Sequence, residues 1–175
     1  MKTAIVLLAC FAYALAQPGC PNIVSRSEWG ARPPKSTTPM YNPVQYVVIH
    51  HTAGSTCTTQ TSCSAEVRAI QNQHMDVNGW NDIGYSFLVG EDGNAYEGRG
   101  WSNVGAHAPG YNDVNRIPNN AAINTCKQLI QCGMDARYVQ YAHSLLGHRQ
   151  AVATECPGDA LYAEIQTWDN YDPTP

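Results

Sequence analysis

Apolar residues occur along this chain in short runs whose spacing changes between that of strands and that of helices. Residues 46–49 form a continuous apolar run rich in β-branched side chains, which predicts a strand buried on both faces. In residues 64–78 the apolar positions recur at helical spacing behind Ser64, which has the chemistry of a helix cap. Asn78-Gly79 predicts the end of this helix.

Later segments continue the alternation of strand and helix. Residues 85–89 and 95–97 predict two short strands joined as a hairpin, since Asp92-Gly93 supplies the positive φ of a tight turn. The remaining expected elements are a loop over 98–115, a helix that begins at Pro118-Asn119 and ends at Gly133, a strand over 144–147 and a helix capped by Asp159. This order predicts an α/β fold, a single domain with a central mixed β-sheet flanked by helices.

The first residues have the character of a secretion signal. Lys2 precedes an apolar stretch over 5–14, and Ala14-Leu15-Ala16 supplies a small-residue cleavage site. We therefore expect a signal peptide over 1–16 and a secreted domain over 17–175. The apolar stretch is shorter than the roughly 20 residues that a membrane anchor needs. A net charge of −4 with 14% charged residues argues against binding to nucleic acid or to an anionic membrane.

Two distant segments carry side chains that could bind one zinc ion. His50 and His51 follow the strand at 46–49, while His148 and Cys156 lie near the carboxyl end of the chain. Successive strand side chains point to opposite faces, so at most one residue of the pair at 50 and 51 can reach the metal. Two imidazoles and one thiolate leave the fourth position of zinc to water, which is typical of a catalytic site. The sequence therefore predicts a metal hydrolase.

The cysteines leave a second interpretation open. Cys10 belongs to the expected signal, and six cysteines remain in a domain that would fold in an oxidising compartment. Six cysteines allow about fifteen complete pairings, which the sequence alone does not rank. If all six were paired, Cys156 would belong to a disulfide and the metal site would not exist.

The chain resembles the peptidoglycan recognition proteins, secreted relatives of phage amidase-type lysozymes, over residues 23–168. The motifs that carry the resemblance are Ser-Arg-Ser-Glu-Trp-Gly at 25–30, Tyr-Val-Val-Ile-His-His-Thr-Ala-Gly at 46–54, Gly-Trp-Asn-Asp-Ile-Gly-Tyr at 79–85, Val-Gly-Glu-Asp-Gly at 89–93, Tyr-Glu-Gly-Arg-Gly-Trp at 96–101, Gly-Ala-His at 105–107, Leu-Gly-His-Arg at 146–149 and Thr-Glu-Cys-Pro-Gly at 154–158. The resemblance implies a secreted innate-immunity protein that binds bacterial peptidoglycan. It also implies a zinc-dependent N-acetylmuramoyl-L-alanine amidase.

Individual roles follow from the resemblance, motif by motif. It makes His50, His148 and Cys156 the zinc ligands and gives catalytic roles to Tyr85 and Thr154. It implies selectivity for meso-diaminopimelate stems through Gly79, Trp80 and Arg99, since arginine can bind the extra carboxylate of diaminopimelate through two parallel hydrogen bonds. Contacts to the muramyl peptide are implied for His107 and Asn112. The implied disulfides are Cys20–Cys132 and Cys57–Cys63, with Cys126 free.

One departure from the family separates this chain from the proteins that it resembles. After Asn112, family members enter an apolar strand of the type Ser-Ile-Gly-Ile-Ser-Phe-Ile-Gly before the next helix, whereas only residues 113–117 stand here. We therefore expect one strand of the sheet to be missing and the fold to be weaker than in relatives. Two further functions stay open: a non-hydrolytic peptidoglycan receptor or antibacterial binder, and an inactive isoform whose sheet does not close.

Overall fold

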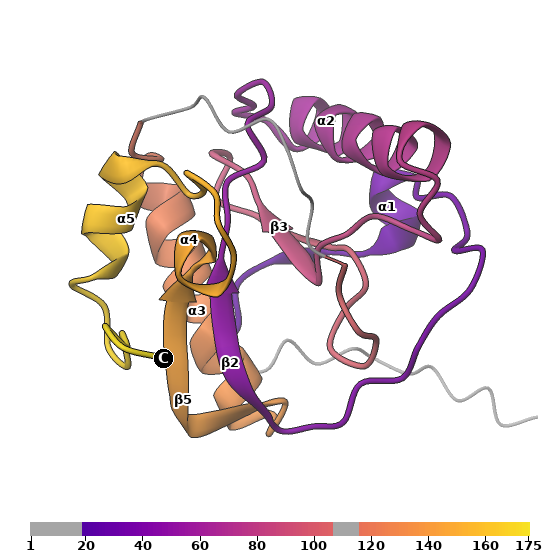
Figure 1. Cartoon of the computed structure of the whole chain (residues 1–175). Coiled ribbons are helices and arrows are strands. Elements are labelled where there is room, and N and C mark those ends of the chain that lie inside the picture. The colour runs from indigo at the N-terminus through magenta and orange to yellow at the C-terminus, as the bar shows by residue number, and fades with distance from the viewer. Residues whose placement is uncertain (1–18, 107–115) are drawn as a thin grey trace, which may run out of the picture.

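The computed structural model describes residues 19–106 and 116–175. The expected signal peptide, His107 and Asn112 therefore lie outside the described residues. The strands are β1 (Ile23–Val24), β2 (Val44–Ile49), β3 (Phe87–Val89), β4 (Ala95–Glu97) and β5 (Val139–Gly147). The helices are α1 (Arg26–Trp29), α2 (Gln60–Asn72) with its π-helical continuation η1 (Gln73–Val77), α3 (Asn120–Asp135), α4 (His148–Ala151) and α5 (Asp159–Ile165) (Figure 1).

The α/β architecture matches the expectation from the sequence, but the strands divide into two sheets. β1, β4 and β3 form a mixed three-stranded sheet, in which β1 is parallel and β3 antiparallel to β4. β2 and β5 form a separate parallel pair. Within the described part of the chain no strand joins β2 to β3, which is where an inserted strand would make the sheet continuous.

Each sheet packs against its own apolar core. The first core lies under the three-stranded sheet and contains Val24, Trp29, Val67, Ile83, Leu88 and Tyr96. The second lies between the parallel pair and α5 and contains Ile49, Leu145, Leu161, Ile165 and Trp168. None of the helices in the described residues is both long and apolar enough to cross a membrane.

The start of α2 differs from the sequence prediction. The helix begins at Gln60 and Thr59 is its cap, because the Thr59 hydroxyl accepts the Ser62 amide at 3.2 Å and the Ser62 hydroxyl accepts the Thr59 amide at 3.2 Å. This reciprocal pair is a capping box that lacks the usual acidic residue. Ser64 is buried inside the helix and is not its cap. The prediction of a helix here is therefore right, but its predicted start is wrong.

Gly133 does not end α3, which continues to Asp135. The beginning is as expected, since the Asn119 side chain accepts the Ala122 amide at 2.9 Å. A Cβ atom on Gly133 would lie 2.8 Å from the ring of Trp101 and 2.9 Å from the side chain of Val139. The glycine therefore allows two elements to approach the helix. β5 also begins earlier than predicted, at Val139, and Asp159 is the first residue of α5 while Gly158 occupies the cap.

Two disulfides connect the described segments in the pairing that the resemblance implies. Cys20–Cys132 ties the segment before β1 to α3 across a sequence separation of 112, and Cys57–Cys63 joins the loop after β2 to α2 across a separation of 6. Among the described cysteines, Cys126 and Cys156 are free thiols. The second interpretation of the cysteines, in which Cys156 belongs to a disulfide, is therefore wrong.

The two disulfides differ in how strongly they restrict the unfolded chain, and this predicts unequal effects on stability. Loop-closure entropy assigns about 5 kcal/mol to the long loop and about 2 kcal/mol to the short one. We expect the double replacement Cys20→Ala with Cys132→Ala to lower the free energy of unfolding by about 2 to 3 kcal/mol more than Cys57→Ala with Cys63→Ala, measured by urea denaturation. Equal losses, or a larger loss from the short loop, would contradict this.

Candidate metal centre

The parallel pairing of β2 and β5 determines where both histidines lie. The register pairs Ile49 with Gly147, the last residues of the two strands. The carboxyl ends of β2 and β5 lie at the same edge of the parallel pair (Figure 1). The next residues, His50 and His148, are therefore neighbours there. His148 then begins the short helix α4. Two residues that are far apart in sequence are therefore neighbours because two strands end together.

Cys156 completes the cluster from the loop before α5. One possible ligand atom from each of His50, His148 and Cys156 lies within 4.8 Å of the other two. The centroids of the two imidazole rings are 4.0 Å apart, and Cys156 Sγ is 3.9 Å from His50 Nδ1. His148 and Cys156 are buried, while His50 is half-buried.

Backbone hydrogen bonds hold the thiol in this position. The Arg149 amide donates to the Cys156 carbonyl at 2.8 Å, and the Cys156 amide donates to Thr154 Oγ1 at 3.3 Å. The His51 amide donates to Cys156 Sγ at 3.4 Å. Arg149 is itself fixed by Asp159 at 2.8 Å. Sequence reasoning assigned no role to Arg149 or to the His51 amide, because these contacts appear only when the loop folds against α4.

The donor set fits a zinc ion. Two imidazoles and one thiolate are ligands that zinc prefers, and at its usual bond lengths a nitrogen and a sulfur ligand lie about 3.6 Å apart in a tetrahedral site. The Cys156–His50 distance of 3.9 Å is close to that value. Burial raises the pKa of the Cys156 thiol, while the His51 amide and the Arg149 charge lower it. A bound cation would favour the thiolate over the thiol at this position.

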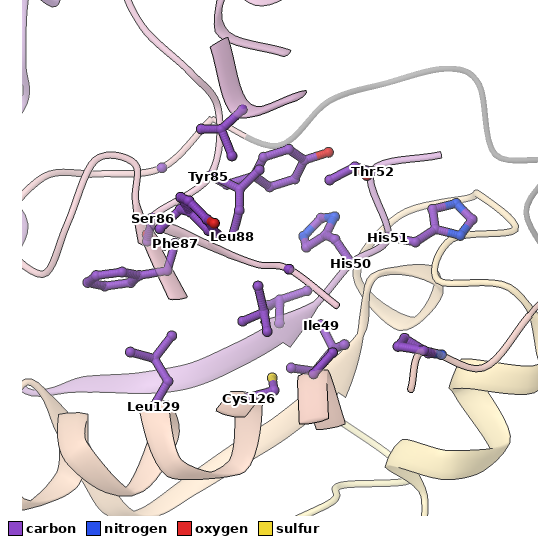
Figure 2. A pocket seen from close by; sticks show the side chains of 18 of the residues that line it. Ile49, His50, His51, Thr52, Tyr85, Ser86, Phe87, Leu88, Cys126 and Leu129 are labelled. Atoms are coloured by element: carbon purple, nitrogen blue, oxygen red, sulfur yellow. The ribbon is translucent and has the colours of Figure 1, made fainter. Parts of the chain in front are cut away.

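Tyr85 lies beside the same cluster on the segment before β3. Its ring centroid is 5.7 Å from that of His50, in an edge-to-face arrangement. Figure 2 shows the two side chains together at one end of a cavity, with Thr52 beside the phenol. Burial, followed by the nearby Cys156 charge, raises the pKa of Tyr85 to about 12. The phenol therefore keeps its proton at neutral pH and can donate a hydrogen bond.

The residues predicted to select the stem peptide lie farther from the cluster. The Trp80 and His74 rings lie in a tilted arrangement with their centroids 4.6 Å apart, and the His74 centroid is 5.7 Å from that of Tyr85. Trp80 is therefore connected to the centre through two intervening rings. Gly79 has a φ of +72°, which allows the turn that leads into Trp80. The backbone around Trp80 is fixed by its amide, which donates to the His74 carbonyl at 2.9 Å.

The structure does not bring Arg99 to the cavity at Tyr85. Its guanidinium donates from Nε to the Ile83 carbonyl at 2.7 Å and from one Nη to the Val104 carbonyl at 2.8 Å. Arg99 instead lines a smaller cavity of about 230 Å³, together with Arg26 and Asp82. Two of its donors are thus directed to the backbone.

Comparison with known proteins places these features in context. Residues 40–159 match the N-acetylmuramoyl-L-alanine amidase family. The chain is 42% identical to "Peptidoglycan-recognition protein SC2" of Drosophila melanogaster, over 96% of this chain and 97% of that protein. It is 41% identical to "N-acetylmuramoyl-L-alanine amidase" of Mus musculus, over 95% of this chain and 34% of that protein.

A solved structure also matches the fold. The crystal structure of peptidoglycan recognition protein-LE in complex with tracheal cytotoxin, described as monomeric diaminopimelic acid-type peptidoglycan, has a TM-score of 0.81 to this chain. The sequence identity is 40%, and the match covers 86% of this chain and 95% of the other. Fold and sequence therefore agree on the same group of proteins.

Proposed function

This chain belongs to the N-acetylmuramoyl-L-alanine amidase family, among the peptidoglycan recognition proteins, and we propose that it is a secreted zinc-dependent amidase acting on bacterial peptidoglycan. The bond cleaved is the amide between the lactyl group of N-acetylmuramic acid and L-alanine. The observation that carries the proposal is the cluster of His50, His148 and Cys156, which offers three possible protein ligands, of which His50 is partly exposed. Three ligands distinguish a catalytic zinc site from a structural one.

The metal and Tyr85 have separate tasks in this proposal. When bound, zinc lowers the pKa of a coordinated water to about 7 and polarises the scissile carbonyl. Tyr85 lies next to His50 and keeps its proton at neutral pH, as an ordinary phenol with a pKa near 10 also does, and burial raises its pKa further, to about 12. Its phenol would donate a hydrogen bond to the oxygen on which negative charge develops.

Other groups keep the thiolate ligand in place. Thr154 accepts the Cys156 amide, which orients the threonine hydroxyl beside the ligand. The His51 amide donates to the sulfur of Cys156, and the Arg149 amide donates to its carbonyl. The His51 bond would stabilise a charged sulfur in this buried loop, where an unsupported thiolate would be costly, and the other two bonds hold the backbone of Cys156.

Selectivity for diaminopimelate-type peptidoglycan is part of the proposal. It is supported by the match to a relative solved with a diaminopimelic acid-type ligand and by the presence of Gly79, Trp80 and Arg99 in the corresponding motifs. Nε and one Nη of Arg99 already bind backbone carbonyls, so the two parallel hydrogen bonds expected from the sequence would not form from two nitrogens. The other Nη would bind the extra carboxylate. His107 and Asn112 would contact the muramyl peptide.

Secretion is proposed from the amino-terminal residues and the disulfides. The segment 1–16 has the charge, apolar stretch and cleavage site of a signal peptide. The two disulfides require an oxidising compartment. Extracellular location also matches the proposed substrate, which lies on the outside of bacterial cells.

Hydrolysis is tested by the release of L-alanine amino termini from diaminopimelate-type peptidoglycan. We expect the purified chain to release them, and we expect both chelation and Cys156→Ser to abolish release, because each removes the metal. Restoring zinc should rescue the chelated protein but not the variant. Cys126→Ser serves as the matched control, since this free thiol lies outside the metal cluster and should not be needed for activity. Binding without release in every sample would favour a non-hydrolytic receptor instead.

The role of Tyr85 makes a distinct prediction for Tyr85→Phe. Loss of one donor to a developing oxyanion should lower kcat about 10²- to 10³-fold, while zinc content stays unchanged. Substrate affinity, measured by calorimetry on the metal-free chain, should change little because the ring is retained. An unchanged kcat would remove Tyr85 from the catalytic groups.

A further inference from the structure

A cavity of about 540 Å³ runs between the edges of β2 and β3. It is lined by every residue of 46–49 and of 86–89, not by alternate ones. Because successive strand side chains point to opposite faces, a space that touches all of them follows the strand edges and opens to both faces of the sheet. The cavity is therefore a slot between two sheets.

Apolar side chains from two helices line the slot. Val67 and Ile70 come from α2, and Ile123, Cys126 and Leu129 come from α3. The two helices lie on different sides of β2 in Figure 1, and Figure 2 shows Cys126 and Leu129 pointing from α3 into the slot. The charged side chains in the lining are Glu66, Glu91 and Arg116, of which the last two form an ion pair at 2.9 Å. An occupant would meet apolar surface on both of its faces.

The edge of β3 presents backbone groups to the slot. The Gly98 amide donates to the Ser86 carbonyl, and the Gly90 amide donates to the Asn94 carbonyl. The backbone groups of Ser86 and Gly90 therefore point toward β4. Hydrogen-bonded positions alternate along an antiparallel ladder. The amide and carbonyl groups of Phe87 and Val89 therefore point away from β4, into the slot.

The edge of β2 does the same from the other side. Leu145 bonds away from β2, since its amide donates to the Asn170 carbonyl and its carbonyl accepts the Asp172 amide. The backbone groups of Ser144 and Leu146 therefore point toward β2. Their register partners are Tyr46 and Val48, and in a parallel ladder each residue bonds to the residues before and after its partner, not to the partner itself. The backbone groups of Tyr46 and Val48 consequently point into the slot.

We propose that this slot is an acceptor site for one β-strand of a partner protein, extended, uncharged and apolar on both faces. The strand would bind Tyr46 and Val48 along one side and Phe87 and Val89 along the other, and would join the two sheets into one. An acyl chain could fill the apolar volume but could not satisfy four amides and four carbonyls, which a strand satisfies along its length. The lining of the slot also includes His50 and Tyr85 at one end. None of the four residues that would pair with the strand is a proposed zinc ligand, so strand binding would not depend on bound metal or on peptidoglycan.

A synthetic strand tests the proposal on the full secreted chain. The probe is the fluorescein-labelled, acetylated and amidated peptide Ser-Ile-Gly-Ile-Ser-Phe-Ile-Gly, whose residues are uncharged and which is of the type that family members carry after the position of Asn112. The matched control is the same peptide N-methylated at alternate residues, which keeps its apolar surface but loses amide donors. We expect saturable binding of one peptide per chain by fluorescence anisotropy, with the methylated peptide about tenfold or more weaker.

Hydrogen exchange and one pair of variants localise the binding. Peptide should slow amide exchange at Tyr46, Val48, Phe87 and Val89. Val89→Pro removes one open amide without removing a bond to β4 and should weaken binding about fivefold, whereas Val89→Ala keeps the amide and should bind nearly as well. If Val89→Pro does not fold, the peptide pair still decides the question.

Four outcomes would overturn the proposal. Equal affinity of the two peptides would mean that apolar filling, and not strand pairing, drives binding. Complete displacement by palmitate together with unchanged exchange at the four amides would assign the slot to a lipid. No saturable binding would exclude a strand acceptor. If the chain self-associates in sedimentation and the four amides are already protected from exchange before peptide is added, the occupant is a second copy and not a separate partner protein.

Discussion

The parallel hydrogen bonding between β2 and β5 is the constraint on which the rest of the site depends. It ends both strands at the same level, and so it places His50 and His148 together before any metal is considered. Gly147 is needed at the same point, because a Cβ atom there would lie 2.7 Å from Tyr162 and 3.2 Å from Ile165. The absence of a side chain at Gly147 therefore lets α5 pack against β5 at the point where the chain leads into His148.

The third ligand is positioned by a different kind of contact. Cys156 lies on a loop that is tied to α4 by the Arg149 amide and to the end of β2 by the His51 amide. The loop is thus fixed to both histidine-bearing segments. This arrangement explains how a fold whose described strands form two sheets still brings the three residues together. His50 and His148 directly follow the parallel pair, Cys156 lies on a loop that is bonded to it, and none of the three depends on a strand between β2 and β3. The expected weakness of the whole fold stays a prediction.

Periodicity identified the elements well, and it located their ends poorly. The runs at 46–49 and 85–97 and the cap at Asn119 predicted a strand, a hairpin and a helix that the structure contains. The predicted helix end at Gly133 is wrong. Glycine is favoured at helix ends, but it is also favoured where another side chain approaches the backbone closely, as Trp101 does here. Thr59 was missed because Ser62 completes its capping box in place of an acidic residue. Local sequence cannot show which tertiary contact a residue satisfies.

The sequence indicated a zinc site built from histidine and cysteine, but it left open the choice between His50 and His51 and a disulfide at Cys156. The family resemblance implied the set of His50, His148 and Cys156 that the structure brings together. The contacts of Arg99 were not predictable, because they depend on two carbonyls brought near by folding. The measurement that tests the account most directly is X-ray absorption at the zinc edge of the purified chain. We expect two nitrogen ligands at about 2.0 to 2.1 Å, one sulfur at about 2.3 Å and one further light atom from water. Failure to bind zinc, or a sulfur shell that survives Cys156→Ser, would contradict it.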